Sequence, residues 1–262
     1  MPILPFTTSH AALAPYRDMH GFAGVARSEI GVPCFICEGR FLVGRALDSG
    51  LRLLSVVATE AAYADLQAQL PPAVPVFIGS KQELESLVGY AFHRGVLCAV
   101  ACPPPPPLSA LLAAKRLVVL PHLDGVENLG LILRSAAALG MDAVLVGKGP
   151  EVFHRRTVRV SMGAAWKIPV FEAEDVLPLL EQWRAHEPGA EVAAAALVPG
   201  AVDARRWRPA ARTALMLGPE GYGLNDRHLA ACNTHVVIPM RAGMDSLNVA
   251  ACAAILMYQM GA

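Results

Sequence analysis

Six short and almost continuously apolar runs in the second part of the chain constrain its fold more than any other feature. They cover residues 116–121, 143–147, 168–171, 192–197, 213–218 and 235–240. Strands that are apolar on both faces are typical of a parallel sheet covered by helices on both sides. Helices with the matching apolar spacing are expected between the strands, over 129–139, 155–163, 176–186, 225–231 and 247–258. This part is therefore predicted to be an α/β domain with a parallel sheet.

The five prolines of CPPPPPL, residues 102–108, divide the chain. Such a run favours a stiff polyproline II spacer with no packed role of its own. We predict an N-terminal part over 1–102, a linker over 103–114 and a C-terminal domain over 115–262.

The N-terminal part is predicted to be a small α/β domain behind a loose tail that extends to about Val32. Apolar strand candidates alternate there with helix candidates, the first of which is expected to end at Gly50. The strand candidates are 53–58, 75–79 and 95–101, and the helix candidates are 43–50, 60–70 and 80–89.

The composition fits a globular protein with a sizeable core, since 54% of the 262 residues are hydrophobic and 17% are charged. The 22 basic residues are balanced by 22 acidic ones, so any nucleic-acid surface must be a local patch. No apolar run reaches the length of a membrane span, and the N-terminus lacks the pattern of a signal peptide. We therefore expect a cytoplasmic protein without a membrane partner.

The CxxC spacing of Cys34 and Cys37 raises the question of a metal site. The pair lies in CFIC, which is typical of a strand, and residues three apart on a strand point to opposite faces. None of the eight histidines has ligand-like spacing. We therefore expect buried reduced thiols and no metal.

Three polar loops follow strand candidates of the second part, and ligands of parallel α/β sheets collect beyond the C-terminal ends of the strands. In the first loop, Asn128 lies near a helix start, where it either caps the helix or serves function. Arg134 is the only charge between residues 129 and 139. The positions three and four away are apolar or small, so its face should pack and the arginine needs an anionic partner or a ligand. The alternative is a solvated charge.

The second loop, GPEGYG over 218–223, carries three glycines that permit close approach of the backbone to a ligand. By itself it is a weak signal, because ordinary turns use the same residues and it matches neither a Walker loop nor a dinucleotide fingerprint.

The third loop precedes a helix that is apolar nearly all round, one surface of which is expected to form a subunit interface. Gly243 is expected to make the turn, and Asp245 or Ser246 to cap the helix. Asn248 is expected to face a ligand, because polar groups at the mouth of such a helix are unfavourable unless they bind something.

ENLGLILRSAAALG, LMLGPEGYGL and IPMRAGMDSLNVAACAAI together resemble the three signature motifs of the SpoU/TrmH-type RNA ribose 2′-O-methyltransferases of the SPOUT class. The motifs occur in the family's order, and the resemblance covers roughly residues 117–259. The N-terminal part, with CFICEGRFLVGRALDSG, is similar to the RNA-binding domain of many members, which is itself similar to kink-turn-binding ribosomal proteins. Where the family often has Asp-Pro, this chain has Gly125 and Val126.

The resemblance implies a deep trefoil knot in the C-terminal domain and an S-adenosylmethionine site at the C-terminal end of its sheet. It also implies a homodimer with the last helix at the interface. The implied catalytic residues are Asn128, Arg134, Glu220, Ser246 and Asn248. The implied cofactor-binding residues are Leu217, Gly218, Glu220, Gly221, Ile238, Met240, Ser246, Leu247 and Asn248.

The implied activity is methylation of a ribose 2′-hydroxyl in RNA, with ribosomal RNA as the expected substrate. The alternatives are a transfer RNA substrate, a non-catalytic RNA-binding protein on the same fold, and an ordinary nucleotide-binding α/β enzyme. The family proposal is that the motif arginine helps to deprotonate the hydroxyl. A guanidinium stays protonated and is an awkward base, so we favour the hypothesis that Arg134 holds an RNA phosphate.

RNA contact requires a local basic patch, and three clusters of arginine and other basic residues are candidates. The clusters are Arg155, Arg156, Arg159 and Lys167; Arg40, Arg45, His93 and Arg94; and Arg205, Arg206, Arg208 and Arg212. Among these we favour Arg155, Arg156, Arg159 and Arg40. A solvated charged face is the alternative for each cluster, and stacking of Trp207 or Tyr222 on a base is weighed against ordinary packing.

Overall fold

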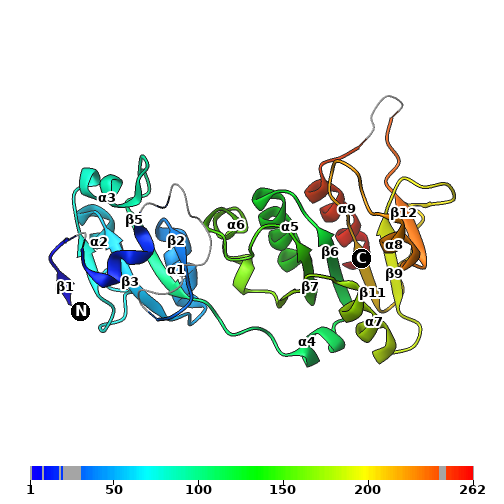
Figure 1. Cartoon of the computed structure of the whole chain (residues 1–262), viewed down its shortest axis with the longest axis horizontal. Helices are drawn as coiled ribbons and strands as arrows, with labels where there is room; N and C mark the ends of the chain where they lie inside the picture. Colours follow the sequence, from blue (N-terminus) through cyan, green and yellow to red (C-terminus); the bar gives the residue numbers. More distant parts are fainter. Residues whose placement is uncertain (1, 8, 18, 20–30, 242–245, 262) are drawn as a thin grey trace. The chain divides into compact units, whose positions relative to one another are not determined.

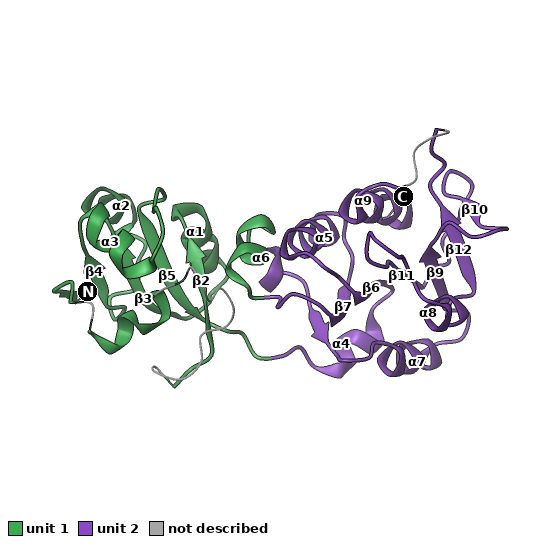
Figure 2. Cartoon of the chain, turned by 45° about the horizontal axis from the view of Figure 1, so that its top comes forward, with its two compact units in different colours: residues 1–104, 153–163 green, residues 105–152, 164–262 purple. Residues whose placement is uncertain are grey.

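The computed structural model (Figure 1) describes residues 2–7, 9–17, 19, 31–241 and 246–261. The chain divides into two compact units, which Figure 2 colours separately. Unit 1 comprises residues 1–104 and 153–163, and unit 2 comprises residues 105–152 and 164–262. Among the described residues, no helix is both long enough and apolar enough to cross a membrane.

Unit 1 contains a five-stranded mixed sheet in the order β1-β4-β3-β5-β2. The strands are β1 Ile3–Leu4, β2 Cys34–Glu38, β3 Leu53–Ala58, β4 Val76–Ile78 and β5 Val96–Ala101. The helices are η1 Ala11–Tyr16, α1 Arg40–Asp48, α2 Glu60–Leu66, α3 Lys81–Val88 and α6 Arg155–Val160. The strands and helices predicted after residue 40 are confirmed within a few residues. Gly50 follows the end of α1 with a φ of +68°, as expected for a helix C-terminus.

The prediction of a loose tail up to about Val32 is wrong for the segment around η1. Leu13 and Tyr16 are fully buried. The Tyr16 hydroxyl donates to the Ser55 carbonyl at 2.7 Å and accepts from the Ala99 amide at 2.7 Å, and burial raises the pKa of this phenol. A short 3-10 turn that contains proline has no helical period of apolar residues, so no sequence pattern indicated this packing.

Unit 2 contains a seven-stranded sheet in the order β10-β12-β9-β11-β6-β7-β8, and all its pairings are parallel, as predicted. Its strands are β6 Arg116–His122, β7 Ala143–Lys148, β8 Val170–Glu172, β9 Glu191–Ala195, β10 Val202–Asp203, β11 Thr213–Met216 and β12 Thr234–Val237. Only the two-residue β10 was not predicted. The knot that the resemblance implies stays a prediction.

The helices of unit 2 cover both faces of this sheet (Figure 2). They are α4 Leu108–Ala113, α5 Val126–Ala138, η2 Ala164–Trp166, α7 Leu177–His186, α8 Asp226–Ala230 and α9 Val249–Gly261. Helices α5 and α9 pack together, and α4 packs against α7. The helices predicted over 129–139, 176–186, 225–231 and 247–258 match α5, α7, α8 and α9 within a few residues, whereas α4 and η2 were not predicted. Helices α5, α7 and α9 each bury several apolar residues.

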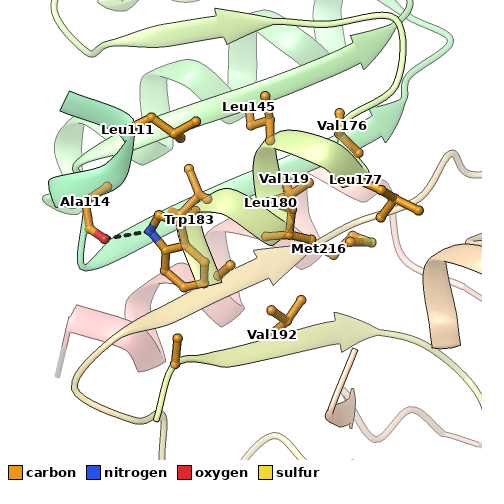
Figure 3. Packing of buried hydrophobic residues seen from close by; sticks show 14 of the residues in the cluster. Leu111, Ala114, Val119, Leu145, Val176, Leu177, Leu180, Trp183, Val192 and Met216 are labelled. Atoms are coloured by element: carbon orange, nitrogen blue, oxygen red, sulfur yellow. Dashed lines mark hydrogen bonds between the residues drawn. The ribbon is translucent and has the colours of Figure 1, made fainter. Parts of the chain in front are cut away.

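The core under α7 includes part of the predicted linker (Figure 3). Leu111 of α4 is fully buried, and the Trp183 indole N–H donates to the Ala114 carbonyl at 2.8 Å. The second half of the predicted linker, 103–114, is therefore packed rather than a free spacer. The compact units also differ from the predicted contiguous domains, since residues 153–163 belong to unit 1.

The side chain of Trp183 gives a test of this core. Trp183→Ala is expected to lower the free energy of unfolding by about 3–5 kcal/mol, because it leaves a cavity between α4, α7 and the sheet. Trp183→Phe is the matched control, with an expected loss of about 1–2 kcal/mol, because it keeps an aromatic ring and loses the hydrogen bond. Urea unfolding followed by circular dichroism measures both. Equal losses in the two variants would contradict a packing role.

Candidate active site

Two of the three loops that the sequence singled out, the second and the third, line one cavity of about 480 Å³ at the C-terminal edge of the unit 2 sheet. The first loop is joined to them by a hydrogen bond from Asn128 to Glu220. The sequence-predicted residues that line it are Leu217, Gly218, Glu220, Gly221, Ile238, Met240, Ser246 and Leu247. Strands β11 and β12 deliver the second and third loops, with β9 between them in the sheet. Parallel strands end at the same edge, so loops that are distant in sequence come together here.

Glu220 links the three loops through one carboxylate oxygen. Its Oε1 accepts hydrogen bonds from Asn128 Nδ2 and from the Val249 amide, each at 3.1 Å, and from Asn248 Nδ2. Asn248 Nδ2 also donates to Asn128 Oδ1 at 3.0 Å. A carboxylate that accepts several N–H donors makes stronger hydrogen bonds than a neutral acceptor. The cluster therefore fixes the start of α5, the glycine loop and the start of α9 with respect to one another.

Asn248 caps helix α9, which begins at Val249. Its Oδ1 accepts from the amides of Ala250 at 3.0 Å and Ala251 at 3.3 Å, which are otherwise unpaired in the first turn. The expectation that Ser246 caps this helix is therefore wrong, and Ser246 lines the cavity instead. The predictions for Gly243 and Asp245 lie outside the described residues.

Asn128 and Asn248 are not among the described residues that line the cavity. Their side-chain amides bond to Glu220, which lines the cavity, and to each other. Within the part of the chain that the structure describes, Asn248 is thus the one residue of the implied cofactor-binding set that does not line the cavity. The hydrogen bonds of Asn248 give it a role in loop positioning, and the expectation that it faces a ligand stays a prediction.

Gly218 is required by the shape of the second loop. A Cβ at this position would lie 2.5 Å from the carbonyl carbon of Gly223 and 2.6 Å from the amide nitrogen of Leu224, which is far below van der Waals contact. Gly223 has a φ of +68°, a conformation that favours glycine. A Cβ at Gly221 would meet no atom within 4 Å. The loop thus closes on itself at its base, while Gly221 is free of this constraint.

Arg134 is exposed on α5, and within the described residues its side chain makes no hydrogen bond or ion pair. The described residues of this chain therefore do not cover the face that carries Arg134, and the expectation that this face packs stays a prediction. Leu131, three residues earlier on the same face, is 41% exposed, whereas Ile132 and Leu133 are fully buried. The apolar stripe that faces the sheet lies on the other side of the helix. The guanidinium is available for a ligand or a partner.

The predicted basic clusters differ in how much of their charge is available. Arg212 is buried with its guanidinium 4.6 Å from the Trp183 ring, and Trp207 is 3% exposed with its indole N–H on Glu191, so neither forms an RNA surface. Arg40 is exposed and pairs with Asp65 at 3.2 Å, and Arg156 is exposed.

The arginines Arg155 and Arg159 instead contact the carboxylate of Glu38 within unit 1. This interaction gives them a structural role that basic spacing alone did not indicate.

Three of the four cysteines of unit 1 are buried. The thiols of Cys34, Cys37 and Cys98 are fully buried in β2 and β5, whereas Cys102 is partly exposed. Burial raises the pKa of the Cys34 thiol to about 11 and that of the Cys37 thiol further, so both are neutral at physiological pH. Across the described residues, no group of three or more His, Cys, Asp or Glu side chains is arranged to hold a metal ion.

One wall of the cavity was not found from the sequence. Residues 195–198, which follow β9, line it, and Tyr222 stands at its rim with 70% of its surface exposed. The chain order separates β9 from β12 by two strands, whereas the sheet places them side by side. Only the strand order could have assigned this loop to the site.

Comparison with known proteins places this architecture among the RNA methyltransferases. The SpoU rRNA Methylase family matches residues 115–258. The chain belongs to this family.

Three similar proteins cover most of the chain. An uncharacterized tRNA/rRNA methyltransferase of Mycobacterium tuberculosis is 35% identical over 94% of this chain and 87% of its own. RlmB of Acinetobacter baylyi, a 23S rRNA (guanosine-2′-O-)-methyltransferase, is 30% identical over 74% of this chain and 81% of its own. The crystal structure of an AdoMet-bound rRNA methyltransferase from Sinorhizobium meliloti has a TM-score of 0.77 at 22% identity, over 98% and 97% of the two chains, which shows a shared fold.

The contrast between two glycines tests the loop geometry. Gly218→Ala is expected to lower the free energy of unfolding by about 1–3 kcal/mol, because the new methyl group must displace the backbone of Gly223 and Leu224. Gly221→Ala is the matched control and should change stability by about 0.5 kcal/mol or less. Urea midpoints of the two variants measure the difference, and similar midpoints would show that the loop does not need its close contact.

Proposed function

We propose that the protein transfers a methyl group from S-adenosylmethionine to a ribose 2′-hydroxyl of RNA, and that the RNA is ribosomal. The observation that carries this proposal is the single cavity lined by residues of two motif loops and tied by Glu220 to the third. The name of the Acinetobacter baylyi relative supports ribosomal RNA and the 2′-oxygen, and the bound AdoMet of the Sinorhizobium meliloti structure supports the methyl donor.

The residues of the cavity fit S-adenosylmethionine in size and in their combination of apolar walls with polar backbone groups. Its volume of about 480 Å³ lies in the range of small-molecule sites, which is about 300–1,000 Å³. Leu217, Ile238, Met240 and Leu247 provide apolar walls, and the Gly218 loop offers backbone amides and carbonyls at close range. When bound, S-adenosylmethionine supplies an electrophilic methyl group on a sulfonium.

The chain's own contribution is to position the two partners and to exclude water. The apolar walls lower the local polarity, which favours a reaction that brings together unlike charges. The Glu220 cluster holds the loops in a fixed arrangement, so Asn128, Glu220 and Asn248 act in this proposal as positioning residues. Ser246 lines the cavity and offers a hydroxyl for a hydrogen bond to a ligand there.

Arg134 holds an RNA phosphate in this proposal and stabilises negative charge as the 2′-hydroxyl loses its proton. Its guanidinium is exposed and uncommitted among the described residues, and its planar fork matches two phosphate oxygens. A guanidinium is a poor proton acceptor at neutral pH, so electrostatic assistance explains its presence better than general-base action.

A homodimer would cover the exposed apolar face of α5 and α9. Leu131, Ile255 and Tyr258 are exposed on these two packed helices, at 41%, 42% and 66%. Large apolar side chains clustered on adjacent helices mark association surfaces. Arg134 lies on the same face as Leu131, so such an interface would bring it near the partner copy.

Transfer RNA is the second candidate substrate, because the relative from Mycobacterium tuberculosis carries both substrates in its name. Incubation with methyl-labelled S-adenosylmethionine and separated ribosomal and transfer RNA fractions distinguishes the two. Nuclease digestion then locates the label, and we expect it on ribose in ribosomal RNA. Label on a base, or no uptake of the donor by folded protein in calorimetry, would refute the proposed reaction.

The role of Arg134 is tested by two substitutions. Arg134→Gln is expected to lower kcat by about 100-fold or more, because it removes the charge that faces the developing anion. Arg134→Lys keeps the charge but loses the fork, so an intermediate loss of about tenfold is expected. Affinity for the donor should stay unchanged in both, since Arg134 does not line the cavity. Near-wild-type turnover of Arg134→Lys would argue against bidentate phosphate holding.

The dimer is tested at Ile255. Ile255→Asp places a charge in the apolar face and is expected to raise the dimer dissociation constant by about 100-fold. Leu108→Asp, at a comparably exposed leucine on α4, is the matched control and should leave it unchanged. Analytical ultracentrifugation over a range of concentrations measures the constant. A monomeric wild-type protein at all concentrations would rule out the interface.

A further inference from the structure

Residues 153–163, which we call the docking arm, leave the unit to which their neighbours in the sequence belong. They lie in the chain between β7 and β8 of unit 2, yet they form part of unit 1, where α6 appears in Figure 2. The chain therefore passes between the units at 104–105, at 152–153 and again at 163–164. A linker alone would give a single passage.

The centre of the arm's attachment is the carboxylate of Glu38, which is 5% exposed at the end of β2. Glu38 Oε2 accepts from Arg155 Nη1 at 3.0 Å and lies 3.8 Å from Arg159 Nη1, while Oε1 lies 3.5 Å from Arg94 Nε. Arg155 Nη1 also donates to the Tyr90 hydroxyl at 2.8 Å, and its guanidinium lies 4.5 Å from the Tyr90 ring centroid. Arg155 is thus the only one of the three arginines at hydrogen-bond distance.

Apolar and backbone contacts hold both ends of the arm. At its start, the ring of Phe153 stacks on that of Phe35 at a centroid distance of 4.8 Å. Near its end, Arg45 of α1 donates to the Met162 carbonyl. Met162 has a φ of +53°, the one positive φ of a non-glycine residue among those described, and Gly163 follows at +84°. This tight left-handed turn ends the arm.

The Glu38 cluster differs in kind from the surface ion pairs of unit 1. The Arg40–Asp65 pair has both side chains more than half exposed, so solvent and salt weaken it. A carboxylate that is almost fully buried is strongly unfavourable without partners. Removal of the arm would take away two of the three cations around Glu38, so the buried charge favours the docked arm.

We propose that Glu38 is an anchor that holds the docking arm on unit 1 and thereby restrains the unit 1 fold relative to the catalytic loops through three chain connections. This inference rests on the proposed function and also takes unit 1 to bind the RNA that unit 2 methylates, as the resemblance of the N-terminal part to an RNA-binding domain implies. A restrained connection raises the effective concentration of the bound ribose at the catalytic unit. Glu38 is then a positioning residue for the RNA substrate that lies outside the catalytic cavity.

Hydrogen exchange of the full-length protein tests the anchor directly. Glu38→Gln and Arg155→Gln are each expected to speed exchange of the arm amides by about tenfold, because each removes a charge-assisted hydrogen bond. The amides of strands β3 and β5 should keep their protection from exchange. The double variant Glu38→Gln/Arg155→Gln should show the same exchange rate of the arm amides as each single variant, because both substitutions break the same hydrogen bond. Glu60→Gln, at an exposed glutamate of the same unit, is the control and should change nothing. Unchanged arm exchange in both single variants would overturn the anchor, even if one of them folded poorly.

The kinetic consequence is measured with the same variants. Glu38→Gln is expected to raise the KM for structured RNA several-fold, while kcat and the affinity for S-adenosylmethionine stay at wild-type values. A fall in all three quantities would indicate a general loss of structure and overturn the positioning role. Absence of methyl transfer by the wild-type protein would refute the proposed function instead, and the exchange result would still decide whether the arm is anchored.

Discussion

The parallel direction of all seven strands in unit 2 is the constraint on which the rest of its structure depends. Because every strand ends at the same edge, the loops after β6, β9, β11 and β12 converge there although they are far apart in the chain. Parallel pairing also requires crossover helices, and these bury both faces of the sheet. The cavity therefore forms at this edge, because the strands deliver their loops there and helices cover both faces of the sheet.

Close contacts within the loops then give this edge its shape. Gly218 allows the second loop to fold back onto Gly223, and the carboxylate of Glu220 ties it to Asn128 and Asn248. These three polar side chains are among the five residues that the family resemblance implies to be catalytic. In the structure their hydrogen bonds are spent on each other and on the backbone, which fits a role in fixing the site better than a role in bond making.

The sequence predicted the elements well where the pattern had a simple period. Apolar runs located six of the seven strands of unit 2, and helical spacing located α5 and α9, because burial of one face imposes these periods on the sequence. Prediction from the sequence failed where the packing of buried residues is irregular. The turn around Tyr16, the buried Leu111 and the buried Trp207 lack any period that separates them from exposed segments.

The difference between what the sequence predicted and what the structure shows is clearest for the charged residues. From the sequence, Arg134, Arg155 and Arg212 were all candidates for contact with RNA. The structure separates them into an exposed guanidinium, an anchor on Glu38 and a buried cation over Trp183. Composition and hydrophobic period are local properties of the sequence. By itself the sequence therefore determined only features that depend on local pattern: the parallel α/β class, the motif loops and the apolar residues of the cavity walls. Tertiary structure alone decided which side chains share the cavity and which charges are neutralised, because both depend on strand order and on contacts between residues about 100 positions apart.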